Sequence, residues 1–182
     1  MCMKRSSSTA SMRWKATNAS VIVDLGANIG VASLYFRALA PQARIVAVEP
    51  DPRAFAMLML NDSVNDAGLE CVHAAVAGAP GAVTLRAERG SWTSHIVPRN
   101  TVGEDVVTTP GLTLDELFMS QELAHVDLLK IDIEGAEWDV LRRSECLDAV
   151  SRVVGEMHEM AGQESTDSFS PELRKHIVSE CR

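Results

Sequence analysis

The stretch Val21-Ile-Val-Asp-Leu-Gly-Ala-Asn-Ile-Gly30 decides how the rest of the chain is interpreted. A short β-branched run ends in an acid, and a glycine-rich turn and an apolar-periodic segment follow it. Strand, tight turn and helix in this order are typical of the nucleoside- or phosphate-binding start of an open α/β sheet, in which ligands bind where the strands end. Gly26 and Gly30 allow the backbone to turn tightly and approach a ligand, because glycine has no Cβ and tolerates positive φ.

Alternating strands and helices are predicted along the whole chain. Strands are expected over residues 21–25, 44–48, 70–77, 125–133 and 151–158, with helices over 29–40, from 53 to about 65, from 113, over 136–147 and from 171. Such alternation predicts an α/β fold with a doubly wound, mostly parallel, Rossmann-like sheet. We expect the strand order 3-2-1-4-5, with the closing antiparallel hairpin of such domains reduced or absent. The edge beyond the fifth strand is then open, covered by the last helix or completed by another subunit.

One part of the chain does not fit this alternation. Residues 82–87 alternate weakly and predict a shorter, partly exposed strand. Residues 90–111 are rich in Ser, Thr, Gly and Pro and predict a long loop with a β-prone piece at 106–109. Within it, Ser91-Trp-Thr-Ser-His95 either closes over a ligand or has no function.

Composition bounds the class of protein. The 182 residues suit a single domain over residues 21–182, preceded by a flexible N-terminal arm of residues 1–20. A formal net charge of -8 argues against nucleic acid as the main partner. No apolar run approaches the roughly 20 residues that span a bilayer, so no membrane partner is expected. Four scattered cysteines without a Cys-x-x-Cys pair indicate a reducing, cytoplasmic environment.

The first candidate site joins the opening turn to Glu49. Glu49 ends the second strand, where folds of this kind hydrogen-bond ribose hydroxyls with a carboxylate. A pyrophosphate needs the bare amides of a Gly-x-Gly-x-x-Gly turn, whereas this turn reads Asp-x-Gly-x-x-x-Gly. Asp24 would repel a pyrophosphate but could meet the ammonium of a methionine moiety. The pattern therefore favours S-adenosylmethionine over NAD, and a plain strand-turn-helix with Asn28 as a cap is the alternative.

The second candidate site is Lys130-Ile-Asp-Ile-Glu-Gly-Ala-Glu137. Lys130, Asp132 and Glu134 fall on one face of a strand, whose side chains alternate with a period of two. Crowded carboxylates can raise one another's pKa toward that of a general base. The alternative is a strand end held by a salt bridge between Lys130 and Asp132. Glu137 is assigned only a favourable contact with the helix dipole.

The third candidate site is Glu156-Met-His158, at the carboxyl end of the next strand. Both polar side chains would project beside Asp132 and Glu134 if the two strands are neighbours. Histidine is the usual general base near neutral pH, so contact with the substrate or base catalysis is favoured. A structural hydrogen-bonded pair and a divalent metal held by all four residues are the alternatives, and no metal is predicted.

Together these motifs resemble the FkbM family of S-adenosylmethionine-dependent methyltransferases. The resemblance is carried by Val23-Asp-Leu-Gly-Ala-Asn-Ile-Gly30, Val48-Glu-Pro-Asp-Pro52, Asp127-Leu-Leu-Lys-Ile-Asp-Ile-Glu-Gly-Ala-Glu-Trp138 and Glu156-Met-His158. It implies the class I methyltransferase fold and methyl transfer to a hydroxyl oxygen of a natural product, sugar or other small molecule. It also implies a set of residues at the cofactor, with Glu49 on the ribose and Asp132 beside the transferable methyl: Asp24, Gly26, Ala27, Asn28, Gly30, Glu49, Pro50, Asp51, Ala75 and Asp132.

O-methylation of a small-molecule hydroxyl is therefore the function predicted from the sequence. His158, Asp132 or Glu134 would be the base, with Glu156 orienting His158. An NAD-dependent oxidoreductase and a non-catalytic methyltransferase-like subunit are the alternatives. A homo-oligomer is a further expectation, and the loops that would name the acceptor carry no decodable signature.

Overall fold

The computed structural model describes residues 18–87, 94–157 and 177–181. Its elements in chain order are β1 (Val21–Leu25), α2 (Val31–Leu39), β2 (Arg44–Val48), α3 (Pro52–Asn65), β3 (Glu70–Val72), β4 (Ala75–Val76), β5 (Gly81–Ala87), β6 (Ser94–Val97), β7 (Val106–Leu112), α4 (Leu114–Ser120), β8 (Leu128–Ile131), α5 (Glu137–Arg143), the 3-10 helix η1 (Cys146–Ala149), β9 (Val153–Met157) and β10 (Ile177–Cys181). None of the helices within these ranges is both long and apolar enough to cross a membrane.

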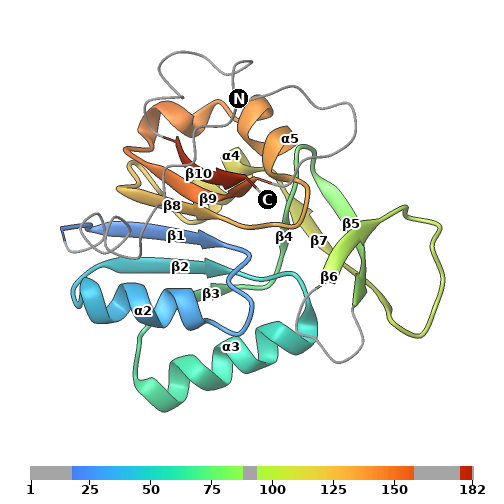
Figure 1. Cartoon of the computed structure of the whole chain (residues 1–182), viewed down its shortest axis with the longest axis horizontal. Helices are drawn as coiled ribbons and strands as arrows, with labels where there is room; N and C mark the ends of the chain where they lie inside the picture. Colours follow the sequence, from blue (N-terminus) through green and yellow to red (C-terminus); the bar gives the residue numbers. More distant parts are fainter. Residues whose placement is uncertain (1–17, 88–93, 158–176, 182) are drawn as a thin grey trace.

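A six-stranded sheet in the order β10-β9-β8-β1-β2-β3 forms the centre of the molecule (Figure 1). Each neighbouring pair in it is parallel. The five strands expected from the sequence are β3, β2, β1, β8 and β9 in spatial order. The predicted mixed α/β fold with a mostly parallel sheet is confirmed, and β1 lies inside it with a parallel neighbour on each side.

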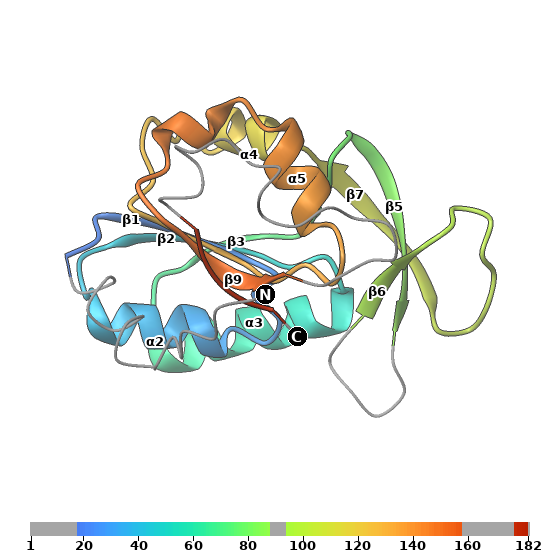
Figure 2. The ribbon, with the colours of Figure 1, turned by 45° about the horizontal axis from the view of Figure 1, so that its top comes forward.

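Helices cover both faces of this sheet, α2 and α3 on one face and α4 and α5 on the other (Figure 2). Alternate residues of β1 explain why both layers form. Ile22 packs in a core with Phe36 of α2 and Leu58 of α3. Val23 packs in a second core with Trp138 of α5. Because β1 is buried on both faces, its sequence is a nearly continuous apolar run.

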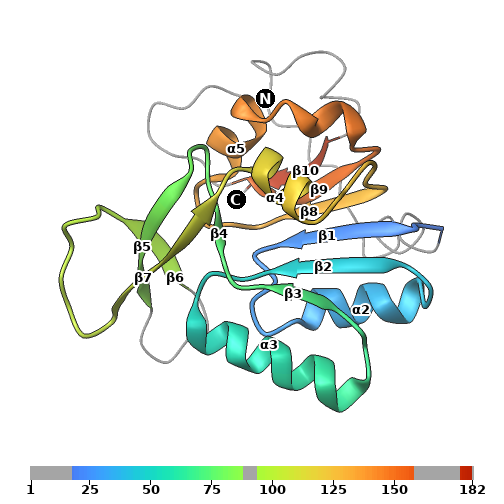
Figure 3. The ribbon, with the colours of Figure 1, turned by 180° about the vertical axis from the view of Figure 1, so that it is seen from behind.

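The predicted third strand is divided between two sheets. Only β3 joins the main sheet, and β4 instead pairs with β7 in a second sheet of order β4-β7-β5-β6. The expected loop over residues 90–111 likewise supplies β6 and β7, which pair antiparallel with β5 (Figure 3). Backbone pairing along β5 therefore orders a segment whose Ser-, Thr-, Gly- and Pro-rich composition predicted a loop.

The C-terminal part differs from the prediction of a last helix. Residues 171–176 lie outside the described ranges, and residues 177–181 form β10, parallel to β9. This strand occupies the edge beyond the fifth strand, and its parallel direction means that it does not form an antiparallel hairpin with β9. The helix predicted over 136–147 is shorter, since α5 ends at Arg143 and η1 follows.

The start of the chain is described from residue 18 onward. The backbone N–H groups of Ser20 and Val21 both donate to one carboxylate oxygen of Asp127, at 2.8 and 3.0 Å. Ser20, which was assigned to the arm, is thus hydrogen-bonded to the residue that precedes β8, while residues 1–17 lie outside the described part.

Candidate active site

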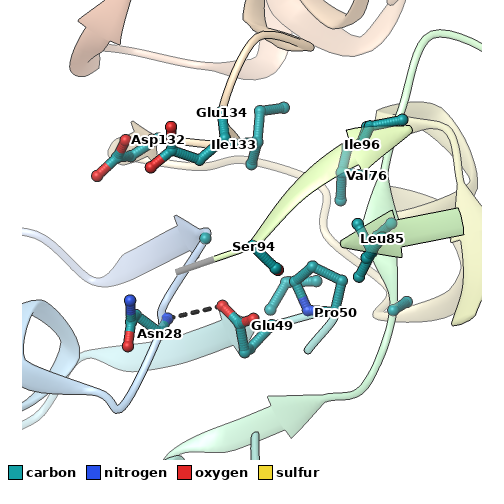
Figure 4. Close-up of a pocket in the computed structure, with 14 residues that line it drawn as sticks. Asn28, Glu49, Pro50, Val76, Leu85, Ser94, Ile96, Asp132, Ile133 and Glu134 are labelled. Atoms are coloured by element: carbon teal, nitrogen blue, oxygen red, sulfur yellow. Dashed lines mark hydrogen bonds between the residues drawn. The ribbon is translucent and has the colours of Figure 1, made fainter. Parts of the chain in front are cut away.

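A pocket opens at the carboxyl ends of β1, β2 and β8, with the second sheet forming its far wall (Figure 4). Its lining residues are Gly26, Asn28, Val48, Glu49, Pro50, Ala74, Ala75, Val76, Leu85, Ser94, Ile96, Asp132, Ile133 and Glu134. Seven of the residues predicted at the cofactor or the chemistry are among them: Gly26, Asn28, Glu49, Pro50, Ala75, Asp132 and Glu134.

The opening turn is held by hydrogen bonds to the neighbouring strand. The N–H groups of Gly26 and Ala27 both donate to the carbonyl oxygen of Val48, at 3.0 and 2.9 Å. Gly26 has a φ of 73°, in the left-handed region that favours glycine. The turn therefore stays against β2 and brings its backbone to the pocket.

Asn28 occupies a left-handed position of the same turn, with a φ of 52°. Asparagine tolerates this conformation better than most residues do. Its Oδ1 accepts the N–H of Ile29 at 2.7 Å, and its own N–H donates to Glu49 at 2.8 Å. Gly30 is the N-cap of α2 and no side chain caps it, so the alternative in which Asn28 caps the helix is wrong. Asn28 lines the pocket, and its contact with the cofactor stays a prediction.

Glu49 is a buried carboxylate at the floor of the pocket, with 5% of the residue exposed. Oε2 accepts the N–H of Asn28 at 2.8 Å (Figure 4). Oε1 accepts the N–H of Asp51 at 2.8 Å. Burial raises the pKa of Glu49 to about 7, although these two N–H donors and the charge of Lys130 act against the rise. Each oxygen keeps a lone pair for a further donor.

Asp24 is enclosed in the sheet and does not line the pocket. It is fully buried, and its Oδ2 accepts the hydroxyl proton of Ser33 at 2.6 Å. The ammonium of Lys130 lies 3.0 Å from its Oδ1. Ser33 and Lys130 therefore already contact both carboxylate oxygens of Asp24. The contact of Asp24 with a methionine ammonium, directly or through water, stays a prediction.

Three other residues predicted at the cofactor are not among the lining residues of the pocket: Ala27, Gly30 and Asp51. Gly30, with a φ of 90°, precedes α2 and lies against Leu58. Asp51 caps α3 by accepting the N–H of Arg53 at 2.8 Å, and its carboxylate pairs with the Arg53 guanidinium at 2.8 Å. Burial would raise the pKa of Asp51, but the hydrogen bonds and charge of Arg53 outweigh it and lower the pKa.

The end of β8 contributes acidic side chains to the pocket. Asp132, with 38% of its side chain exposed, and Glu134 both line it. Lys130 does not, and its ammonium lies 3.8 Å from Asp132 Oδ2. Lys130 thus does pair with Asp132, as the alternative interpretation expected, but this contact is longer than the 3.0 Å contact between Lys130 and Asp24.

Glu137 is a site residue whose role was missed from the sequence. It is fully buried and accepts the N–H groups of Ile133 and Gly135 at 3.0–3.1 Å. The turn that it holds contains left-handed conformations at Glu134 and Gly135, with φ of 52° and 99°. The available signal in the sequence was Gly135 followed by Glu137, since an acid two residues after a glycine turn can accept the N–H groups of that turn.

A comparison with protein families now identifies the chain. The model of the methyltransferase FkbM domain matches residues 24–181. The chain belongs to the FkbM methyltransferase family. Methyltransferase sdnD of Sordaria araneosa is 33% identical over 174 aligned positions, which cover 78% of this chain and 67% of that protein. Methyltransferase 1 of Beauveria bassiana is 31% identical over 169 positions, covering 81% and 68%.

Among solved structures, this FkbM-family chain is similar to the methyltransferase FkbM from Methylobacillus flagellatus KT. The sequence identity is 17% and the TM-score 0.48, over 72% of this chain and 30% of that one.

The third candidate site of this FkbM-family chain is described only through its backbone. β9 is the parallel neighbour of β8, as the sequence interpretation required. Glu156 lies in β9 opposite Glu180 of β10 in the register. His158 lies outside the described residues, so its predicted role as base stays a prediction.

The far wall of the pocket comes from the second sheet of this FkbM-family chain. Val76 of β4, Leu85 of β5 and Ile96 of β6 are apolar, and Ser94 adds a hydroxyl. Ser94 belongs to the segment that was expected either to close over a ligand or to have no function. Val76 adjoins Ala75, around which the chain was predicted to lie near the adenine. Leu85 and Ile96 were missed, since no local sequence pattern indicates that their strands face the pocket.

Proposed function

We propose that this chain transfers a methyl group from S-adenosylmethionine to a hydroxyl oxygen of a small molecule. The observation that carries the cofactor assignment is Glu49, whose two oxygens each accept one backbone N–H at the floor of the pocket. A carboxylate fixed in this way can accept one more hydrogen bond at each oxygen. Two vicinal ribose hydroxyls are donors that match it.

The hydrogen bonds of the opening turn favour this cofactor over a dinucleotide. Every backbone N–H from residue 26 to residue 30 is donated within the chain, to Val48, Ala27, Asn28 or Glu49. A pyrophosphate would need such N–H groups to be available. A ligand with a ribose but no phosphate does not need them, which supports S-adenosylmethionine over NAD.

The acidic residues at the end of β8 suit the chemistry of transfer. S-adenosylmethionine, when bound, supplies an electrophilic methyl carbon whose bond to sulfur breaks as the bond to the acceptor oxygen forms. The chain has to orient the acceptor and take up the hydroxyl proton. We assign the proton to the carboxylate of Asp132 or Glu134, both of which line the pocket.

The apolar wall suits the body of an organic ligand. Val76, Leu85 and Ile96 face the pocket opposite Glu49 (Figure 4). Small-molecule sites usually combine such apolar surface with a few polar groups that fix the orientation. This supports a small-molecule acceptor rather than a macromolecule.

Calorimetric titration of the purified chain with S-adenosylhomocysteine tests the cofactor assignment. We expect saturable binding, weakened by Glu49→Ala, and no comparable binding of NADH. Binding of NADH without binding of S-adenosylhomocysteine would overturn the proposal in favour of an oxidoreductase.

Mass spectrometry tests the transfer itself. A panel of hydroxylated small molecules is incubated with S-adenosylmethionine that carries a trideuterated methyl group, so that products are identified by their mass shift. We expect a labelled product with the wild type and much less of it with Asp132→Asn. Cofactor binding without any product would contradict the catalytic part and favour a non-catalytic subunit.

A further inference from the structure

Lys130 is a cation held directly behind the opening turn. Only 12% of its side chain is exposed, and its ammonium donates to the carbonyl oxygen of Gly26 at 2.7 Å. The same ammonium lies 3.0 Å from Asp24 Oδ1 and 3.8 Å from Asp132 Oδ2. The side chain of Lys130 in β8 therefore contacts the opening turn through Gly26, β1 through Asp24 and the end of β8 through Asp132.

Gly26 is consequently held from two sides. Its N–H donates to Val48 of β2 at 3.0 Å, and its carbonyl oxygen accepts from Lys130 of β8. The two hydrogen bonds connect the turn after β1 to both strands that flank β1. Hydrogen bonds to charged groups are stronger than neutral ones, so the contact on the Lys130 side is the stronger of the two.

Three carboxylates face Lys130, each from a different part of the sheet. Asp24 comes from β1, Glu49 follows β2 and Asp132 follows β8. Burial alone would lower the pKa of Lys130, but the charges of Asp24 and Asp132 outweigh it and raise the pKa. The charge of Lys130 in turn lowers the pKa of Glu49. Lys130 is thus a countercharge shared by the acidic groups around the pocket.

We propose that Lys130 is a positioning residue that fixes the opening turn against the end of β8 and thereby sets the affinity for the nucleoside cofactor. It acts through Gly26 and the neighbouring carboxylates, since Lys130 itself does not line the pocket. The choice of ligand rests on the proposed function, whereas the effect on the turn does not.

Lys130→Met tests this role, because methionine keeps an unbranched stem of the same length and removes the ammonium. Loss of one charged hydrogen bond corresponds to roughly 10- to 100-fold in affinity, and we expect S-adenosylhomocysteine binding to weaken by that factor. Arg44→Met is the matched control. It removes a cation from the start of β2, where Arg44 pairs with Glu70 at 2.7 Å, and should leave the affinity unchanged.

The double variant Asp24→Asn/Lys130→Met covers the case in which the single variant does not fold. It removes the buried negative charge together with its partner, but the hydrogen bond to Gly26 is still lost. We expect it to fold and to bind S-adenosylhomocysteine more weakly than wild type. Wild-type affinity in the folded double variant would overturn the proposal.

Two measurements without ligand separate this proposal from the proposed function. Hydrogen exchange of residues 26–30 should be faster in Lys130→Met and unchanged in Arg44→Met. The pKa of Glu49, followed by NMR of labelled carboxyl carbons, should be higher in Lys130→Met than in wild type. Unchanged exchange and an unchanged pKa would overturn the role of Lys130 even if the cofactor binds. If exchange and the pKa of Glu49 change as expected but the wild type binds no S-adenosylhomocysteine, only the cofactor assignment is contradicted.

Discussion

Gly26 and Asp132 lie so close together that no side chain fits between them. A Cβ on residue 26 would stand 1.8 Å from the carbonyl oxygen of Asp132. The N–H of Asp132 in turn donates to the carbonyl oxygen of Leu25 at 3.1 Å. The turn proposed to hold the cofactor and the strand end proposed to carry the base are therefore packed backbone to backbone, and their spacing is fixed by the fold.

Gly26→Ala should consequently cost more than an ordinary substitution of a left-handed glycine. We expect the free energy of unfolding to fall by roughly 3 kcal/mol or more, because a Cβ would overlap a backbone atom that cannot move independently. Gly68→Ala is the control, since Gly68 has a φ of 63° and a Cβ added to it would meet nothing within 4 Å. It should cost only about 1–2 kcal/mol of backbone strain. Urea unfolding compares the two, and equal costs would contradict the close contact.

The pKa of Glu49 predicts how cofactor binding depends on pH. Ribose hydroxyls donate to the ionised carboxylate, and with a pKa of about 7 that form becomes scarce at lower pH. We expect the affinity for S-adenosylhomocysteine to fall about tenfold between the plateau above pH 8 and pH 6. Calorimetry across this range measures it.

Glu49→Gln is the control for this pH dependence. It should bind more weakly and show a flat profile, because the amide does not titrate. A profile with the same slope in Glu49→Gln would assign the pH dependence of binding to a group other than Glu49.

The same pKa predicts an opposite trend for stability. The folded-state pKa of about 7 exceeds the ordinary value of 4.5, so the folded state binds the proton more tightly than the unfolded state between these values. The contribution of Glu49 to stability is present below pH 4.5 and is lost as the pH rises to 7, by up to about 3 kcal/mol. Urea unfolding of wild type and Glu49→Gln measures the difference between their free energies of unfolding. This difference should change most steeply with pH between pH 5 and 7. If the stability of the wild type instead increased relative to that of Glu49→Gln as the pH rises, the raised pKa of Glu49 would be contradicted.

The sequence predicted the parts of the site that depend on one strand and its turn. Gly26, Asn28 and Glu49 follow from local chemistry, because a glycine turn after a buried strand and an acid after the next strand meet at the same edge of a parallel sheet. β1, β2 and β8 were predictable because each is buried and apolar over most of its length, and β9 because it begins with the buried Val153 and Val154.

Long-range pairing accounts for what the sequence did not predict. β6 and β7 are ordered by antiparallel contacts with β5, and no local pattern in residues 90–111 indicates that partner. The enclosure of Asp24 could not be predicted either, since it depends on register. Asp24 lies opposite Lys130 in the parallel pairing of β1 and β8, which brings together two residues that are far apart in the chain.

The turn after β8 leads to a last prediction, which concerns Glu137. Its carboxylate accepts the N–H groups of Ile133 and Gly135, and Ile133 and Glu134 line the pocket. Glu137→Ala removes the acceptor of two partly buried N–H groups, so we expect the free energy of unfolding to fall by roughly 2–3 kcal/mol. Because the turn carries pocket residues, methyl transfer and S-adenosylhomocysteine affinity should fall as well.

Glu116→Ala is the matched control for Glu137. Glu116 also accepts a backbone N–H at a helix start, that of Thr113 at 2.8 Å, but it belongs to α4 and does not line the pocket. It should lower stability by about 1 kcal/mol and leave cofactor affinity unchanged. If both variants lose stability and neither loses affinity, Glu137 supports the helix alone and the geometry of the turn does not depend on it.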